Sequence, residues 1–137
     1  MSGDSKDLFL AAAKVREHAY APYSGYRVGA AILDTDGAVH CGTNTENASF
    51  PLGACAEANA IGAMIASGGT RIKKIAVIGG RDAPEDCTPC GGCRQRIAEF
   101  ATNDTEIHLM EASGDIRVYT MESLLPAAFH WPEHPTE

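Results

Sequence analysis

Cys55-Ala56-Glu57 and Pro89-Cys90-Gly91-Gly92-Cys93 are the two short segments that decide how this chain is interpreted. Together they supply three possible thiolate ligands and one carboxylate, and each segment leads into a stretch with helical character. Three protein ligands leave the fourth tetrahedral position of Zn²⁺ open to water, which distinguishes a catalytic zinc site from a structural one. Glu57 would then be free to move protons. The pattern therefore predicts a zinc enzyme with Cys55, Cys90 and Cys93 as ligands.

The expected helices give these residues a common environment. We expect Cys55 in the first turn of a helix over residues 54–67, and Cys90 and Cys93 in the first turn of a helix over residues 92–101. Free backbone N–H groups and the positive end of the helix dipole favour thiolates over thiols at such positions. Glu57 follows on the same turn, close enough to face a metal-bound water without being a ligand.

Spacing alone leaves other metal centres open. Cys87 and Cys90 form a second, overlapping Cys-x-x-Cys, so that Cys87 with the other three cysteines could close a structural Cys₄ zinc site or hold an iron–sulfur cluster. A structural site would make the protein a zinc-stabilised binding module, not an enzyme. A brown colour with visible absorbance would identify the cluster.

The composition bounds the class of protein. At 137 residues, with 45% apolar and 21% charged residues, we expect one globular domain over residues 1–137, with a loose polar tail after about residue 131. A net charge of −7 argues against a polynucleotide partner and favours a small-molecule substrate. We expect no membrane span and no signal peptide. Five cysteines at metal-like spacing indicate a reducing, cytoplasmic location.

Periodicity predicts a mixed α/β fold. Apolar residues at helical spacing indicate a helix over residues 5–19, and two short apolar runs around a Thr-Asp-Gly turn indicate a hairpin of residues 28–33 and 38–43. Further strands are expected over residues 74–79, 106–110 and 116–120, with a short helix over residues 121–125. Helices interleaved with strands predict a sheet of about five strands that is covered by helices on both faces.

Four further segments strengthen the interpretation. They are Ala19-Tyr20-Ala21-Pro22-Tyr23-Ser24-Gly25-Tyr26-Arg27-Val28-Gly29-Ala30-Ala31, Asn44-Thr45-Glu46-Asn47-Ala48-Ser49-Phe50, Cys93-Arg94-Gln95 and Leu124-Leu125-Pro126-Ala127-Ala128-Phe129. With the two cysteine segments, whose pattern is that of zinc nucleobase deaminases, they resemble the cytidine deaminases of pyrimidine salvage from about residue 8 to residue 129. The resemblance implies a three-layer α/β/α deaminase fold, one Zn²⁺ per chain, and hydrolysis of cytidine or deoxycytidine to the uridine product and ammonia.

The resemblance also implies roles for individual residues. Cys55, Cys90 and Cys93 match the family's zinc ligands, Glu57 matches its proton shuttle, and the Ala56 backbone matches a contact to the cytosine ring. Asn44 and Glu46 match the pair that holds the ribose hydroxyls, and Tyr26 stands where the family usually has a Phe beside the nucleoside. Phe129 matches an aromatic residue that reaches the base bound by a neighbouring subunit, and the chain length resembles the homotetrameric, all-cysteine class.

One departure concerns the residue after the catalytic Glu. The tetrameric, all-cysteine members usually have an Arg there, which hydrogen-bonds the thiolates, but this chain has Ala58. We expect Arg94 to supply part of the missing positive charge. Blasticidin S deaminases also lack that Arg and have a Trp near the carboxyl end, as Trp131 is here, so an atypical cytosine nucleoside or aminopyrimidine is the alternative substrate. Cys41 is expected to be a buried small residue and Cys87 a loop cysteine.

Overall fold

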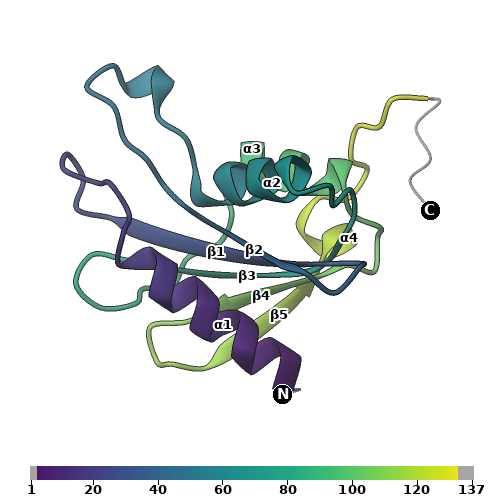
Figure 1. The fold of residues 1–137 in the computed structure, drawn as a ribbon, viewed down its shortest axis with the longest axis horizontal. Coiled ribbons are helices and arrows are strands. Elements are labelled where there is room, and N and C mark those ends of the chain that lie inside the picture. The colour runs from purple at the N-terminus through teal and green to yellow at the C-terminus, as the bar shows by residue number, and fades with distance from the viewer. Residues whose placement is uncertain (1–2, 133–137) are drawn as a thin grey trace.

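A five-stranded sheet forms the centre of the computed structural model, which describes residues 3–132. Its strands are β1 (Arg27–Asp34), β2 (Val39–Thr43), β3 (Ile72–Gly80), β4 (Glu106–Met110) and β5 (Ile116–Thr120). They lie in the order β2-β1-β3-β4-β5, and only the β3–β4 pair is parallel (Figure 1). The expected mixed sheet of five strands is confirmed.

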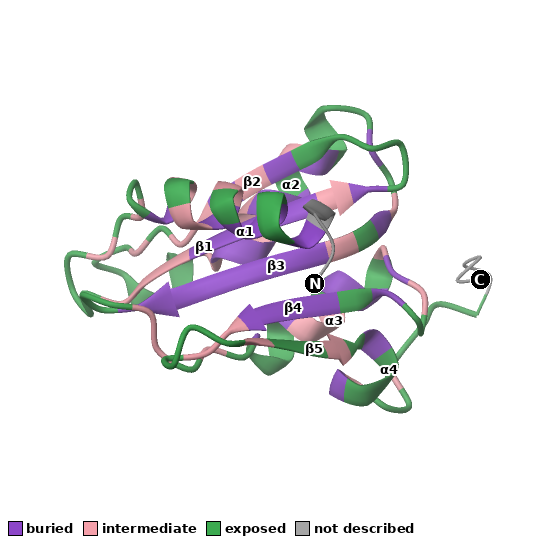
Figure 2. Cartoon of the chain, turned by 90° about the horizontal axis from the view of Figure 1, so that it is seen from below, coloured by how far each residue is buried: buried purple, intermediate pink, exposed green. Residues whose placement is uncertain are grey.

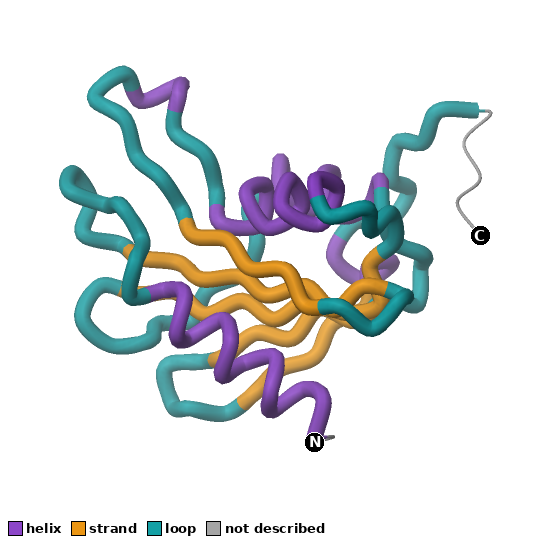
Figure 3. The backbone as a smooth tube through the Cα atoms, in the orientation of Figure 1, coloured by secondary structure: helices purple, strands orange, loops and turns teal. Residues whose placement is uncertain are grey.

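Helices cover both faces of this sheet. They are α1 (Gly3–Arg16), α2 (Ala56–Ala66), α3 (Gly91–Glu99) and the single turn α4 (Met121–Leu124), with a 3₁₀ turn η1 at Phe50–Leu52. Figures 1 and 3 show α1 on one side of the sheet and α2 and α3 side by side on the other. The three-layer α/β/α arrangement expected from the sequence is therefore confirmed.

Alternating side chains of the strands build two separate cores. Ala30 and Ile32 point to the core under α2 and α3, whereas Ala31 between them packs with Leu8 and Phe9 of α1. This is the two-residue period of a strand that is buried on both faces. Figure 2 shows β3 buried along almost its whole length and the edge strand β5 largely exposed. The central strands of the sheet are thus buried between the helices on its two faces.

Gly42 in β2 allows α2 to lie very close to the sheet. A Cβ atom at this position would lie 2.3 Å from the backbone nitrogen of Ala60 and 2.7 Å from the carbonyl oxygen of Ala56, which no real structure tolerates. The missing side chain therefore fixes the height of the first turn of α2 above β2. That turn carries Glu57.

Among the helix boundaries that differ from the prediction, the end of α1 and the start of α2 have the same cause. The helix expected over residues 5–19 ends at Arg16, because the backbone of Tyr20 pairs with the segment after β2, donating to Asn44 and accepting from Glu46. Similarly, Ala54 is paired with Thr45 through two backbone hydrogen bonds, so α2 begins at residue 56 and not at 54. Long-range strand pairing overrides local helix propensity in both places. The boundaries of β4 and β5 agree with the prediction.

The carboxyl-terminal tail expected after about residue 131 falls mainly on residues 133–137, outside the described residues. Trp131 and Pro132, which are described, are exposed. Within residues 3–132, no helix is both long enough and apolar enough to span a membrane.

Candidate metal centre and active site

Two helix N-termini bring three cysteines together. Cys55 is the N-cap of α2 and Cys90 the N-cap of α3, both with extended backbone, while Cys93 lies in the first turn of α3. Their Sγ atoms all lie within 4.8 Å of one another. The sequence predicted this convergence, because each motif immediately precedes a helix.

The sulfur cluster fits a tetrahedral zinc ion. With Zn–S bonds of about 2.3 Å, two ligands of a tetrahedral site lie roughly 3.8 Å apart, which is compatible with the observed spacing. In the described part of the chain, the cysteines that could share a metal are these three, and Cys87 is not among them. The donor set therefore matches the open, three-ligand type of zinc site and not a closed Cys₄ site.

Burial controls the protonation of the thiols. It raises the pKa of the Cys55 and Cys93 thiols, whereas the backbone N–H of Cys93 faces the sulfur of Cys90 and lowers its pKa. Thiolates are the ligand form, so a metal entering this centre must displace protons from the Cys55 and Cys93 thiols.

Glu57 is the buried carboxyl group beside the cluster. Only 5% of its surface is exposed, and desolvation raises its pKa above the ordinary glutamate value, although the charge of Arg96 opposes this shift. A carboxyl group whose pKa moves toward neutrality can both accept and return a proton at the pH of the cell. The side chain is therefore well suited to acid–base work in the cavity.

A cavity of about 330 Å³ opens over the cluster, a size suited to a small organic molecule. Its lining comes from the segment after β2, the start of α2 and the loop before α3: Val28, Asn44, Thr45, Glu46, Phe50, Gly53, Ala54, Cys55, Ala56, Glu57, Cys87, Thr88 and Cys90. A second cavity of about 410 Å³ shares Glu46, Phe50 and Gly53 with it. The sequence did not point to Phe50, Cys87 or Thr88 as lining residues.

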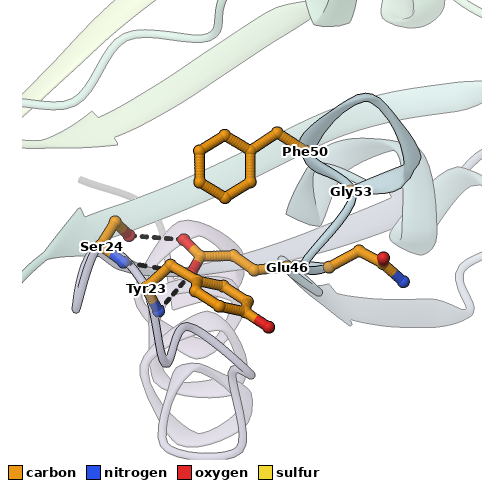
Figure 4. Close-up of a pocket in the computed structure, with 6 residues that line it drawn as sticks. Tyr23, Ser24, Glu46, Phe50 and Gly53 are labelled. Atoms are coloured by element: carbon orange, nitrogen blue, oxygen red, sulfur yellow. Dashed lines mark hydrogen bonds between the residues drawn. The ribbon is translucent and has the colours of Figure 1, made fainter.

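Glu46 lies at the junction of the two cavities. Its Oε1 accepts hydrogen bonds from the backbone N–H groups of Tyr23 and Ser24 at 3.0 and 3.2 Å, and its Oε2 accepts one from the Ser24 hydroxyl. Figure 4 shows the carboxylate held by these groups, with the rings of Phe50 and Tyr23 nearby. The hydroxyl of Ser24 is the main reason that the pKa of Glu46 is lowered, so this side chain is a carboxylate at neutral pH.

Asn44 connects the segment after β2 to the start of β1. Its Oδ1 accepts from the N–H of Val28 and its Nδ2 donates to the carbonyl of Tyr26, both at 2.8 Å. An amide group can make four hydrogen bonds, so one N–H and one lone pair remain for a ligand in the cavity. Glu46 can also contact a ligand, because its Oε2 keeps unused capacity to accept hydrogen bonds.

Tyr26 and Phe129, two expected substrate contacts, do not line the cavity in this chain. Tyr26 is half-buried and its side chain lies beside Cys87, which does line the cavity. Phe129 is 68% exposed, and its carbonyl accepts a hydrogen bond from the side chain of Gln95. Ala56, by contrast, is in the lining at the first position of α2.

Two arginines lie near the cluster, and they have different contacts. Arg94 donates to the carbonyl oxygens of Pro89 and Leu124 at 2.9 and 3.0 Å, and so connects the loop before α3 to α4. Arg96, which the sequence interpretation overlooked, places its Nη1 3.8 Å from the Sγ of Cys93. The signal was present in the sequence, because residues three apart on a helix lie on the same face.

Known proteins are similar to this chain in sequence and in fold. The family model of the cytidine and deoxycytidylate deaminase zinc-binding region matches residues 2–109. Proteins named cytidine deaminase from Sporosarcina psychrophila and Halalkalibacterium halodurans are 40% and 43% identical over 126 residues, which is 92% of this chain and 91% and 94% of theirs. The crystal structure of a cytidine deaminase from Burkholderia pseudomallei matches with a TM-score of 0.84 and 41% identity, over 94% of this chain and all of that one. The chain thus belongs to the zinc-binding cytidine and deoxycytidylate deaminase family.

Proposed function

We propose that this protein hydrolyses cytidine and deoxycytidine to uridine and deoxyuridine with release of ammonia. One observation carries the proposal: a buried carboxyl group, Glu57, lines the same open cavity as Cys55 and Cys90, whose sulfur atoms are spaced with that of the buried Cys93 for one zinc ion. Relatives over nine-tenths of the chain bear the name cytidine deaminase, which supports the same reaction.

The chemistry divides between the metal and the protein. Zn²⁺ held by Cys55, Cys90 and Cys93 supplies Lewis acidity, which makes water nucleophilic at neutral pH. Glu57 accepts a proton from the attacking water, delivers it to the ring nitrogen of cytosine, and then helps to protonate the departing amine. The C4–N bond breaks as the C4 carbonyl forms, so cytidine and water become uridine and ammonia. Burial of Glu57 suits it to each of these transfers.

Binding of the nucleoside falls to the rest of the cavity. The backbone of Ala56, at the start of α2, would contact the cytosine ring, and Asn44 and Glu46 would hold the ribose hydroxyls with the hydrogen-bonding capacity that their backbone contacts leave free. Tyr26 would act indirectly, by supporting Cys87 in the cavity wall. Fixed partners give both sugar-binding side chains one orientation, which lowers the entropic cost of binding.

The expected assembly is a homotetramer in which Phe129 reaches a neighbouring subunit's substrate. The exposed ring of Phe129 and its absence from the lining of its own chain's cavity support this role. The cytoplasm is the expected compartment, because all five cysteines are free thiols, three of them in the metal cluster.

Steady-state rates on four compounds, measured in one assay with zinc-loaded protein, test the proposed reaction. We expect saturable turnover of cytidine and deoxycytidine, and much slower turnover of cytosine and blasticidin S. Preference for blasticidin S would identify the atypical substrate class. If none of the four compounds is deaminated while one zinc ion remains bound, the centre is structural and the proposal is wrong.

Phe129→Ala tests the role across the interface. We expect KM for cytidine to rise about tenfold or more, because stacking an aromatic ring on a base contributes roughly 1–3 kcal/mol. The matched control is Trp131→Ala, which removes an aromatic side chain of similar exposure (66%) from the same segment. Equal KM values for the two variants and the wild type, or a monomeric native mass, would contradict this role.

A further inference from the structure

The metal centre proposed above has an unbalanced charge. Three thiolates exceed the charge of Zn²⁺ by one, and the carboxylate form of Glu57 adds another negative charge in a buried position. Negative charge of this kind, if not compensated, strengthens electron donation to a metal and weakens its ability to activate water. Ala58, after the catalytic Glu, provides no cation.

Arg96 places a positive charge next to this negatively charged cluster. It lies three residues after Cys93 on α3, and its Nη1 donates toward the Cys93 sulfur at 3.8 Å, within the range of a hydrogen bond to sulfur. Among the described residues, Arg96 is the arginine that contacts a sulfur of the cluster. Arg94 instead donates to two carbonyl oxygens.

Gly92 leaves the space that this contact needs. A Cβ atom at residue 92 would lie 3.1 Å from Nη1 of Arg96, so even an Ala side chain there would shift the guanidinium group by a few tenths of an ångström. The first turn of α3 therefore allows Arg96 to fold back along the helix toward the sulfur atoms.

We propose that Arg96 is the charge-compensating residue of the metal centre, which it stabilises through the Cys93 sulfur, while Arg94 has a structural role. Arg96 does not touch substrate in this account. It acts through a ligand, by holding negative charge on the sulfur so that less is donated to the metal. This inference rests on the proposed zinc site, but not on the identity of the substrate.

Arg96→Gln, compared with Arg96→Lys, tests the proposal in the full-length protein. For Arg96→Gln we expect about tenfold faster loss of Zn²⁺ to a chelator, the lower end of the range for residues that contact metal ligands. After exchange of zinc for Co²⁺, the sulfur-to-cobalt charge-transfer band should move to longer wavelength, because a sulfur without its hydrogen-bond donor gives up electrons more easily. Arg96→Lys, which keeps the charge, should restore most of both properties.

The control is Lys73→Gln, which removes the same charge from an exposed position at the opposite end of β3 from the cavity. It should leave zinc loss and the cobalt spectrum unchanged. The proposal is wrong if Arg96→Gln behaves like Lys73→Gln, or if Arg94→Gln, and not Arg96→Gln, shifts the cobalt band of a folded protein. Neither readout requires cytidine turnover, so an inactive protein with a shifted band would reject the proposed reaction and keep this inference.

Discussion

Replacing Glu57 by Gln is expected to lower kcat for cytidine by about 10³-fold or more while one zinc ion per chain remains bound. Gln has nearly the same shape and suits a site that is 5% exposed, so the fold should persist. It cannot accept or return a proton, and loss of a positioned acid–base group costs typically 10²- to 10⁴-fold. Because Glu57 serves several proton transfers in the proposed reaction, we expect the upper half of this range.

Zinc content, thermal unfolding and kcat must be measured together on the same preparations. Glu122→Gln, which changes an exposed carboxylate in the first turn of α4, controls for the loss of a negative charge. Nearly normal kcat in a zinc-loaded Glu57→Gln protein would show that the proton shuttle is another group, and the role of Glu57 would have to be abandoned.

Gly42→Ala is expected to destabilise the protein by about 3 kcal/mol or more and to abolish most activity. Overpacking costs typically 1–3 kcal/mol, and here the added methyl group would meet backbone atoms of α2 that cannot rotate away. Relief requires α2 to move away from β2, and this movement would carry Cys55 and Glu57 with it. Chemical denaturation and zinc content measure the two effects separately.

Gly62→Ala is the matched control within α2. Nothing lies within 4 Å of the Cβ atom that it would add, and Ala is favoured over Gly inside a helix by about 0.5–1 kcal/mol. This variant should therefore be slightly more stable than the wild type and fully active. If Gly42→Ala were equally harmless, the close approach of α2 to β2 would not determine the geometry of the site.

The metal cluster was predictable because its information is local. Cys55 and Cys90 each stand directly before a helix, and helix N-termini above one sheet edge can converge on one ion. The sheet and its layers were predictable for a similar reason, since short apolar runs bounded by turn residues identify the buried strands. The end of α1 at Arg16 and the start of α2 at Ala56 were not, because Tyr20 and Ala54, which pair with residues 44–46, have their partners far away in the chain.

The contacts around the cluster could not be predicted from the sequence, because they depend on the directions of side chains, which residue spacing alone does not give. Arg94, next to Cys93, seemed the natural compensating cation, but adjacent residues on a helix point in different directions. Its guanidinium group therefore reaches the carbonyl oxygens of Pro89 and Leu124, and Arg96 takes the position beside the sulfur. Tyr26 likewise occupies the expected position in the chain, yet its side chain lies beside Cys87 and is not itself part of the cavity lining.

Uridine formation from cytidine, measured while zinc is titrated back into metal-free protein, tests the central claim most directly. The account predicts that the rate rises in proportion to bound zinc and reaches its plateau at one ion per chain. A folded protein that binds one zinc ion and forms no uridine, or one that forms uridine equally well without zinc, would contradict it.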